Sequence, residues 1–191
     1  MNPNDGIDRA MTGADNALYQ ELVLEHKRKP RHFGHLQAPN GRARGHNPQC
    51  GDDLQVEVQV GDGTLRDIAF SGQGCAICIA SASMMSEALV GRDLDAVRQL
   101  QQRFRSVITG ETEPEAANLG KLVSLAGVRR YPSRIKCALL GWHALMHALA
   151  DHAGASAAPA GLVGAGATDG VESDSGAKRT STPGAGPTRV A

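Results

Sequence analysis

Hydrophobic and polar residues alternate in the middle of the chain and follow a helical period elsewhere. From position 54 to position 60 every second residue is Leu or Val, which predicts a half-buried strand. A Gly-Asp-Gly turn at 61–63 follows, and Ile68 and Phe70 then alternate with other residues again. This pattern predicts an antiparallel hairpin, and the segment 41–46 is expected to add an edge strand.

Helical periodicity covers most of the remaining apolar positions. One helix is predicted before the strands and four after them, over 17–29, 77–90, 94–110, 114–127 and 133–150. Pro30 stops the first helix, and Gly91 and Gly110 end the next two, because glycine accepts the left-handed conformation common at helix ends. Strands followed by helices predict an α+β fold, with a small three-stranded antiparallel sheet and helices packed on one of its faces.

The two ends of the chain differ in composition from its middle. Residues 151–191 are almost all Ala, Gly, Ser, Thr and Pro, and they hold too few large apolar side chains to offset the entropy cost of ordering. The polar residues 1–15 share this property. We therefore expect one folded domain over 16–150, between a disordered N-terminus and a disordered low-complexity tail.

The overall charge excludes several classes of partner. The formal net charge is zero, so no basic field favours nucleic acid or an anionic membrane. No apolar segment approaches the length of a membrane span, and the N-terminus lacks the apolar region of a signal peptide. These features predict a cytoplasmic protein. In that reducing compartment cysteines act as metal ligands or reactive thiols more often than as disulfides.

Three of the four cysteines occupy positions that favour chemistry. Cys50 and Asp52 flank a glycine in a predicted loop, where both side chains can turn toward one ion. Cys75 directly precedes a predicted helix, and Cys137 follows Ser133, a suitable N-cap residue for the last helix. The positive end of a helix dipole favours the thiolate form of a nearby cysteine. Each cysteine taken alone is as well explained as a small apolar core residue, so the prediction depends on the combination.

Zinc chemistry suits this set of side chains. Tetrahedral Zn²⁺ accepts thiolate sulfur and carboxylate oxygen, and three thiolates with one carboxylate leave a formal charge of about −2. Arg134 and Lys136 lie beside Cys137 in sequence and could offset this negative charge. The same cations could stabilise a bound persulfide, which is also an anion.

Other residues offer alternatives. Cys75 and Cys78 form a Cys-x-x-Cys pair, but the βαβ pattern expected around a thioredoxin-like redox motif is missing, and Cys78 is predicted to pack among apolar neighbours. His46 precedes Cys50 and ranks second to Asp52 as a ligand. The remaining histidines considered are predicted to lie on polar or solvated faces: His26, His32, His35, His143 and His147.

Together these motifs resemble a known family. The segments 47–52, 74–75, 80–85 and 134–137 are similar to those of SufU, a branch of the iron–sulfur scaffold superfamily that also includes IscU and the N-terminal domain of NifU. The resemblance covers about 18–149. IscU-type members carry a His before the last cysteine, where this chain has Lys136. SufU-type members carry a helical insertion, a role that 92–127 fills here.

The resemblance implies both a ligand set and a reaction. Zinc would be bound by Cys50, Asp52, Cys75 and Cys137. The partner would be a PLP-dependent cysteine desulfurase of the SufS type, whose docking would release Cys50 from zinc, with a His of the partner taking its place. Cys50 would then accept persulfide sulfur and pass it to the downstream iron–sulfur assembly machinery, and Arg134 would position or stabilise this exchange.

Two alternatives to this sulfurtransferase remain open at the level of sequence. The first is an IscU-like scaffold on which a transient [2Fe–2S] cluster is built and transferred. The second is a purely structural zinc domain in which no cysteine reacts. In addition, Cys78 stands where the family has a small residue, which leaves open an all-cysteine site without Asp52.

Overall fold

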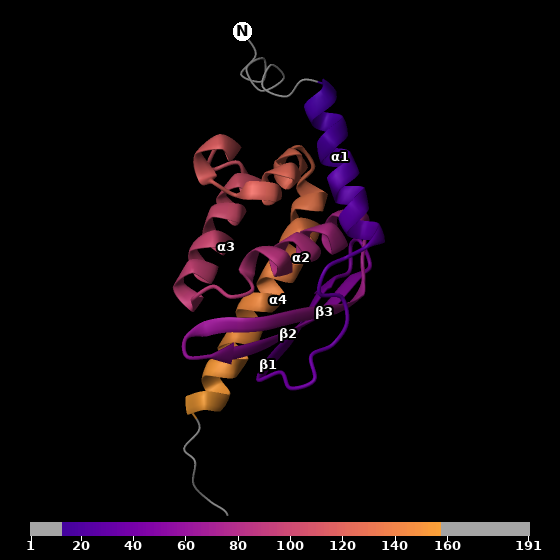
Figure 1. Ribbon diagram of the computed structural model, residues 1–191. Helices are drawn as coiled ribbons and strands as arrows, with labels where there is room; N and C mark the ends of the chain where they lie inside the picture. Colours follow the sequence, from indigo (N-terminus) through magenta and orange to yellow (C-terminus); the bar gives the residue numbers. More distant parts are fainter. Residues whose placement is uncertain (1–12, 158–191) are drawn as a thin grey trace, which may run out of the picture. The chain divides into compact units, whose positions relative to one another are not determined.

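The alternating segments form the three-stranded antiparallel sheet that their pattern predicts (Figure 1). The computed structural model describes residues 13–157. The strands are β1 (Gly41–Asn47), β2 (Asp52–Gly61) and β3 (Thr64–Gln73), in the order β1-β2-β3. The predicted edge strand and hairpin are therefore both confirmed.

The hairpin turn follows from its two central residues. Asp62 and Gly63 both have positive φ, 51° and 69°, which matches the twist that a two-residue hairpin turn requires. Leu54, Val56 and Val58 on β2 have no exposed surface and point into the core. On the opposite face, Glu57 is also buried. The segment around Leu36 covers it, because the backbone N–H of Leu36 donates to Glu57 Oε2 at 2.9 Å.

Helices pack on one face of this sheet. They are α1 (Gly13–Arg28), α2 (Ala76–Leu89), α3 (Leu94–Thr109), two 3₁₀ segments η1 (Pro114–Ala117) and η2 (Gly120–Arg130), and α4 (Pro132–Ala157). In Figure 1, α4 runs across the sheet beside α2, and it contacts both β1 and β2. The core is mainly aliphatic, although Trp142 of α4 stacks on Phe104 of α3 with ring centroids 4.8 Å apart. The predicted α+β architecture is confirmed.

The predicted helix over 114–127 is wrong in detail. Two 3₁₀ segments replace it, because Asn118 and Gly120 adopt positive φ values of 48° and 56°, which an α-helix does not allow. Gly127, predicted to close this helix, lies within η2. The irregular backbone of this segment helps to form a cavity with α2 and α3.

Two helices pass the predicted limits of the folded domain. The first helix begins at Gly13, four positions before the predicted start, and α4 ends at Ala157 instead of residue 150. The last helix also begins at Pro132, so Ser133 lies inside it and is not the predicted N-cap. The disordered segments predicted over 1–15 and 151–191 lie largely outside the described residues and stay predictions. Within 13–157, no helix is long and apolar enough to cross a membrane.

Candidate metal centre

Asp52 and Cys75 are brought together where β2 begins and α2 starts. Cys75 is the N-cap residue of α2, as its position before a predicted helix indicates. Its backbone N–H donates to Asp52 Oδ1 at 2.7 Å, and its Sγ lies 4.0 Å from Asp52 Oδ2. Asp52 has no exposed surface. The hairpin therefore places a buried carboxylate against the start of a helix, where a helix dipole favours negative charge.

Cys50 and Cys137 meet close to this carboxylate. Gly51 has φ of 68°, and the tight turn it permits between β1 and β2 presents Cys50 to α4. The Sγ atoms of Cys50 and Cys137 lie 3.1 Å apart, and both residues are free thiols. One ligand atom each from Cys50, Asp52 and Cys137 lies within 4.8 Å of the others. Three of the four predicted ligands, up to 87 positions apart in sequence, thus gather at one point. Cys75 lies outside this group and is connected to it through Asp52.

These four side chains differ in how deeply they are buried. Asp52 and Cys137 are fully buried, whereas Cys50 and Cys75 are only partly covered. Burial raises the pKa of the Cys137 thiol far above its usual range, and hydrogen bonds to Asp52 and Cys50 raise it further. Within the described part of the chain, Asp52 forms no ion pair with a basic side chain. Because buried charges are normally paired or coordinate metals, this donor set fits a divalent cation that prefers sulfur, such as Zn²⁺.

Two basic side chains approach the centre in different ways. Arg134 Nη1 lies 3.7 Å from Cys50 Sγ. Charge on Cys75, a hydrogen bond with Cys137 and charge on Cys50 raise the pKa of the Arg134 guanidinium. Lys136 instead donates from Nζ to Gln49 Oε1 at 3.2 Å, on the loop before Cys50. Arg134 is thus the cation in contact with a thiol, and Lys136 anchors the loop that carries this thiol.

The structure adds residues that sequence reasoning did not assign to the site. Buried Asn47 donates from Nδ2 to Cys137 Sγ at 3.4 Å, and Lys27 of α1 donates from Nζ to the carbonyl oxygen of Gly74 at 2.9 Å. Asn47 belongs to the motif around Cys50, so the sequence could have indicated that it lies near the site. Lys27 gave none, because it is 47 positions away from Gly74 in sequence.

Cys78 lies beside the centre but outside the ligand group. It is fully buried, and burial raises the pKa of its thiol. Asp52, not Cys78, shares the donor group with Cys50 and Cys137. A Cβ on Gly74 would stand 3.0 Å from Cys78 Sγ and 3.3 Å from Asp52 Oδ1. A larger residue here would therefore force the core thiol and the carboxylate to shift by a few tenths of an ångström.

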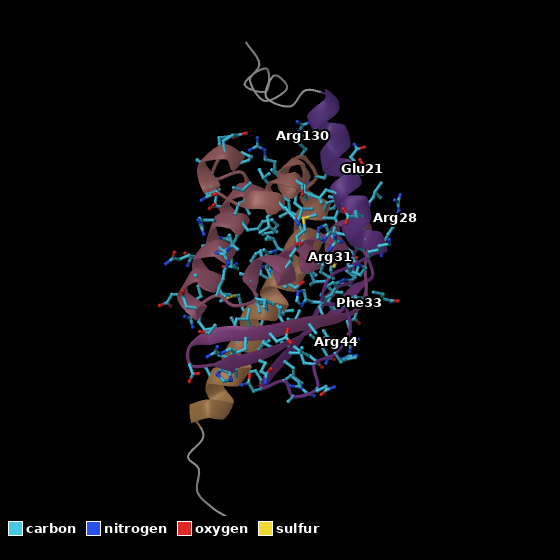
Figure 2. All side chains as sticks on the ribbon, viewed as in Figure 1. Glu21, Arg28, Arg31, Phe33, Arg44 and Arg130 are labelled. Atoms are coloured by element: carbon cyan, nitrogen blue, oxygen red, sulfur yellow. The ribbon has the colours of Figure 1, made fainter. Side chains whose placement is uncertain are left out.

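The histidines take no part in this group. The ring of His46 lies near Asp53, with Nδ1 3.8 Å from Oδ2. The predicted solvated face around His26 is correct only in part. Arg28 is exposed at the end of α1 (Figure 2), but His26 is fully buried and its Nδ1 lies 2.8 Å from Ser83 Oγ. The helical period of α1 turns this one polar residue toward α2.

Comparison with known proteins shows relatives over most of the described residues. A family model described as the NifU-like N terminal domain matches residues 18–138. The iron–sulfur cluster assembly scaffold protein IscU of Streptococcus pyogenes serotype M1 is 37% identical over 140 residues, 73% of this chain and 87% of that protein. The zinc-dependent sulfurtransferase SufU of Bacillus subtilis is 33% identical over 139 residues, 73% of this chain and 94% of that protein.

Solved structures show the same architecture. A crystal structure described as an iron–sulfur cluster assembly scaffold protein for the SUF system, from Fervidobacterium islandicum, superposes with a TM-score of 0.65 at 27% identity. The match covers 70% of this chain and 98% of that structure. The motifs, the fold and these matches lead to one conclusion. This chain belongs to the family of NifU-like N-terminal domains, whose IscU and SufU members are its relatives in iron–sulfur cluster assembly.

Proposed function

We propose that this chain is a zinc-dependent sulfurtransferase that takes persulfide sulfur from a PLP-dependent cysteine desulfurase of the SufS type. The observation that carries the proposal is the difference in burial among the side chains of the metal centre. Cys137 and Asp52 are fully buried, whereas Cys50 is partly exposed and in contact with Arg134. A site with two buried ligands and one accessible thiol suits a protein that receives sulfur from a donor protein. We place this relay in the cytoplasm, where thiols stay reduced.

In the proposed site, Cys50, Asp52, Cys75 and Cys137 hold the ion. When bound, zinc keeps coordinating thiols deprotonated and contributes to folding. The chain prepares the ligands itself. The N–H of Cys75 fixes the Asp52 carboxylate, and the amide of Asn47 donates to Cys137 Sγ. Such contacts orient ligands and limit the conformations they must lose on binding.

Cys50 is the sulfur acceptor in this proposal. Its thiolate attacks the outer sulfur of the donor's persulfide, so a new S–S bond forms at Cys50 while the donor's S–S bond breaks. The donor cysteine leaves as a thiolate, and the exchange needs no external oxidant or reductant. Arg134 stabilises the persulfide anion left on Cys50, because a guanidinium forms strong charge-assisted hydrogen bonds to anions.

Two further observations support the sulfurtransferase over a scaffold. The B. subtilis relative, 33% identical over most of its length, is named a zinc-dependent sulfurtransferase. Lys136 occupies the position before the last cysteine, and its ammonium group donates to Gln49. An ammonium group is a poor substitute for an imidazole ligand to iron, because a protonated amine has no free electron pair.

The test uses purified protein, a SufS-type desulfurase and cysteine. We expect intact-mass spectrometry to show one added sulfur atom on the wild type and none on Cys50→Ala. Cys78→Ala is the matched control, since it removes a thiol outside the ligand group and should still gain sulfur. Full stimulation of cysteine-to-alanine turnover by Cys50→Ala would exclude the proposal.

A scaffold function is the second candidate, and the name of the S. pyogenes relative favours it. In that case the apoprotein would assemble a [2Fe–2S] cluster under anaerobic conditions and pass it intact to an apo-ferredoxin. We expect inefficient transfer from this chain. Efficient transfer, together with the absence of a Cys50 persulfide, would favour the scaffold.

A further inference from the structure

A cavity lies between α2, α3 and η2, and none of the four proposed metal ligands lines it. Its volume is about 400 Å³, within the range of small-molecule sites, which is about 300–1,000 Å³. Met84, Leu100 and Leu122 give it an apolar wall. Its charged lining residues are Glu87, Arg92, Arg103 and Lys121. The cavity therefore combines an apolar wall with an excess of basic groups.

The single carboxylate in the lining is already paired. Lys121 Nζ donates to Glu87 Oε1 at 2.9 Å, so these two charges neutralise each other. Arg92 and Arg103 remain. Arg92 donates from Nε to the carbonyl oxygen of Ala88 at 2.6 Å, and within the described part of the chain no carboxylate pairs with either guanidinium. Two uncompensated positive charges thus face one cavity.

Arg103 is the most informative of these residues. Its Nε is buried and has no hydrogen-bond partner among the described residues. A buried donor without a partner costs stability, and such groups are rare in native proteins. A fold that only needed to fill space here would gain by replacing Arg103 with an apolar side chain. The arrangement is explained if a ligand supplies the missing acceptor.

We propose that this cavity binds a small organic anion, with a carboxylate or phosphate head group on an apolar body. A guanidinium presents several N–H donors in one plane and matches the oxygens of both head groups. The leucine and methionine side chains would contact the apolar body. Arg92, Arg103 and Lys121 all lie in the segment 92–127, so this helical segment supplies the basic groups of the ligand site.

Three probes that share an eight-carbon chain separate the contributions of charge and apolar contact. Octyl phosphate and octanoate carry the two candidate head groups, and octanol carries none. Binding to the full-length zinc-loaded protein is followed by amide chemical shifts and by calorimetry. We expect at least one anionic probe to bind about tenfold or more tightly than octanol, since hydrogen bonds between charged groups contribute that much. The largest changes in amide chemical shift should occur at residues 118–122.

The head group follows from which anionic probe binds more tightly. Tighter binding of octyl phosphate assigns a phosphate ester, and tighter binding of octanoate assigns a carboxylate. Equal binding of all three probes, or binding of none, overturns the proposal. Shifts centred on Cys50 and Cys137 would overturn it as well.

Arg103→Met is the decisive variant, because it keeps a long side chain and removes the charge. We expect affinity for the preferred anion to fall about tenfold or more. Arg98→Met is the matched control on the same helix, where Arg98 is paired with Asp95 outside the cavity lining. Without ligand, the melting temperature of Arg103→Met should equal or exceed that of the wild type, since an unpaired buried donor is removed. Unchanged affinity, or a large loss of stability, would refute the assignment.

Discussion

The metal centre is lined by acidic groups, whereas the cavity between α2, α3 and η2 has an excess of basic groups. In both regions, charged groups lack a partner of opposite charge among the described residues. At the metal centre, three thiols surround a buried carboxylate that has no basic partner among the described residues. In the cavity, two guanidinium groups have no acidic partner among those residues. Asp52 is a fully buried carboxylate, and Arg103 carries a buried Nε without a partner. Because buried polar groups need partners, each arrangement indicates a ligand of opposite charge. The two sites lie toward opposite ends of α2, near Cys75 and near Glu87.

The two regions also differ in how firmly they are built. The metal centre depends on close backbone contacts, with Gly74 pressed between a thiol and a carboxylate. The cavity lies beside 3₁₀ segments, and a Cβ on Gly127 of η2 would meet no atom within 4 Å. A metal needs ligands at fixed distances, whereas an organic anion tolerates a wider site.

Removing the buried carboxylate should have the largest effect. We expect Asp52→Asn to weaken zinc binding by at least about 100-fold. Even the loss of a residue that only hydrogen-bonds to a metal ligand lowers metal affinity about 10–100-fold. Elemental analysis and chelator competition measure this loss. Asp53→Asn is the matched control, because Asp53 is the next residue but pairs with Arg44. Arg44 lies on the sheet (Figure 2). Retention of full zinc affinity by Asp52→Asn would exclude Asp52 from the ligand set.

Crowding the metal centre should be the next most damaging change. We expect Gly74→Ala to lower the free energy of unfolding by about 1–3 kcal/mol, because the added Cβ crowds Cys78 and Asp52. Zinc content should fall as well. Gly127→Ala has open space and should change stability little. Equal melting temperatures for the two variants would mean that the metal centre is not the more tightly packed region.

Removing the cation at the reactive thiol should slow sulfur uptake without removing zinc. We expect Arg134→Gln to lower the rate of Cys50 persulfide formation about tenfold, the equivalent of one charge-assisted hydrogen bond. Lys136→Gln should have a smaller effect, since Lys136 contacts the loop and not the thiol. Time-resolved mass spectrometry gives both rates. A larger defect in the Lys136 variant would reverse these assignments.

The smallest expected effect concerns His26, which lies beside the cavity residue Glu87. His26 Nε2 is 3.8 Å from Glu87 Oε2, yet burial, followed by the charge of Arg31, lowers the pKa of His26 from 6.5. The unfolded chain therefore binds a proton more readily, and stability should fall as the pH drops below about 6.5. The decrease should level off below the folded-state pKa.

His26→Gln should weaken this pH dependence, because it removes the imidazole that titrates. Melting temperatures across the acidic range, taken as the difference from the wild type, measure the effect. The exposed His147→Gln variant serves as the control. If both variants follow the wild-type curve, His26 does not contribute to acid sensitivity.

Local patterns determined much of this protein. The alternation from Leu54 to Val60 predicted β2, because side chains in a strand point to opposite faces with a period of two. The Cys-Gly-Asp turn and the cysteine before α2 indicated where the proposed metal ligands lie, since both signals depend on adjacent residues. Gly110 marked the end of α3, where it adopts φ of 81°.

Only the tertiary structure decided the features that depend on distant residues. Cys137 comes within 3.1 Å of Cys50 because α4 packs across the sheet, and His26 is buried because α1 packs on α2. The paired Glu87 and the unpaired Arg103 come together only when α2, α3 and η2 enclose a cavity. Local propensity acts within a few residues, whereas burial and charge pairing depend on which surfaces meet in the folded chain.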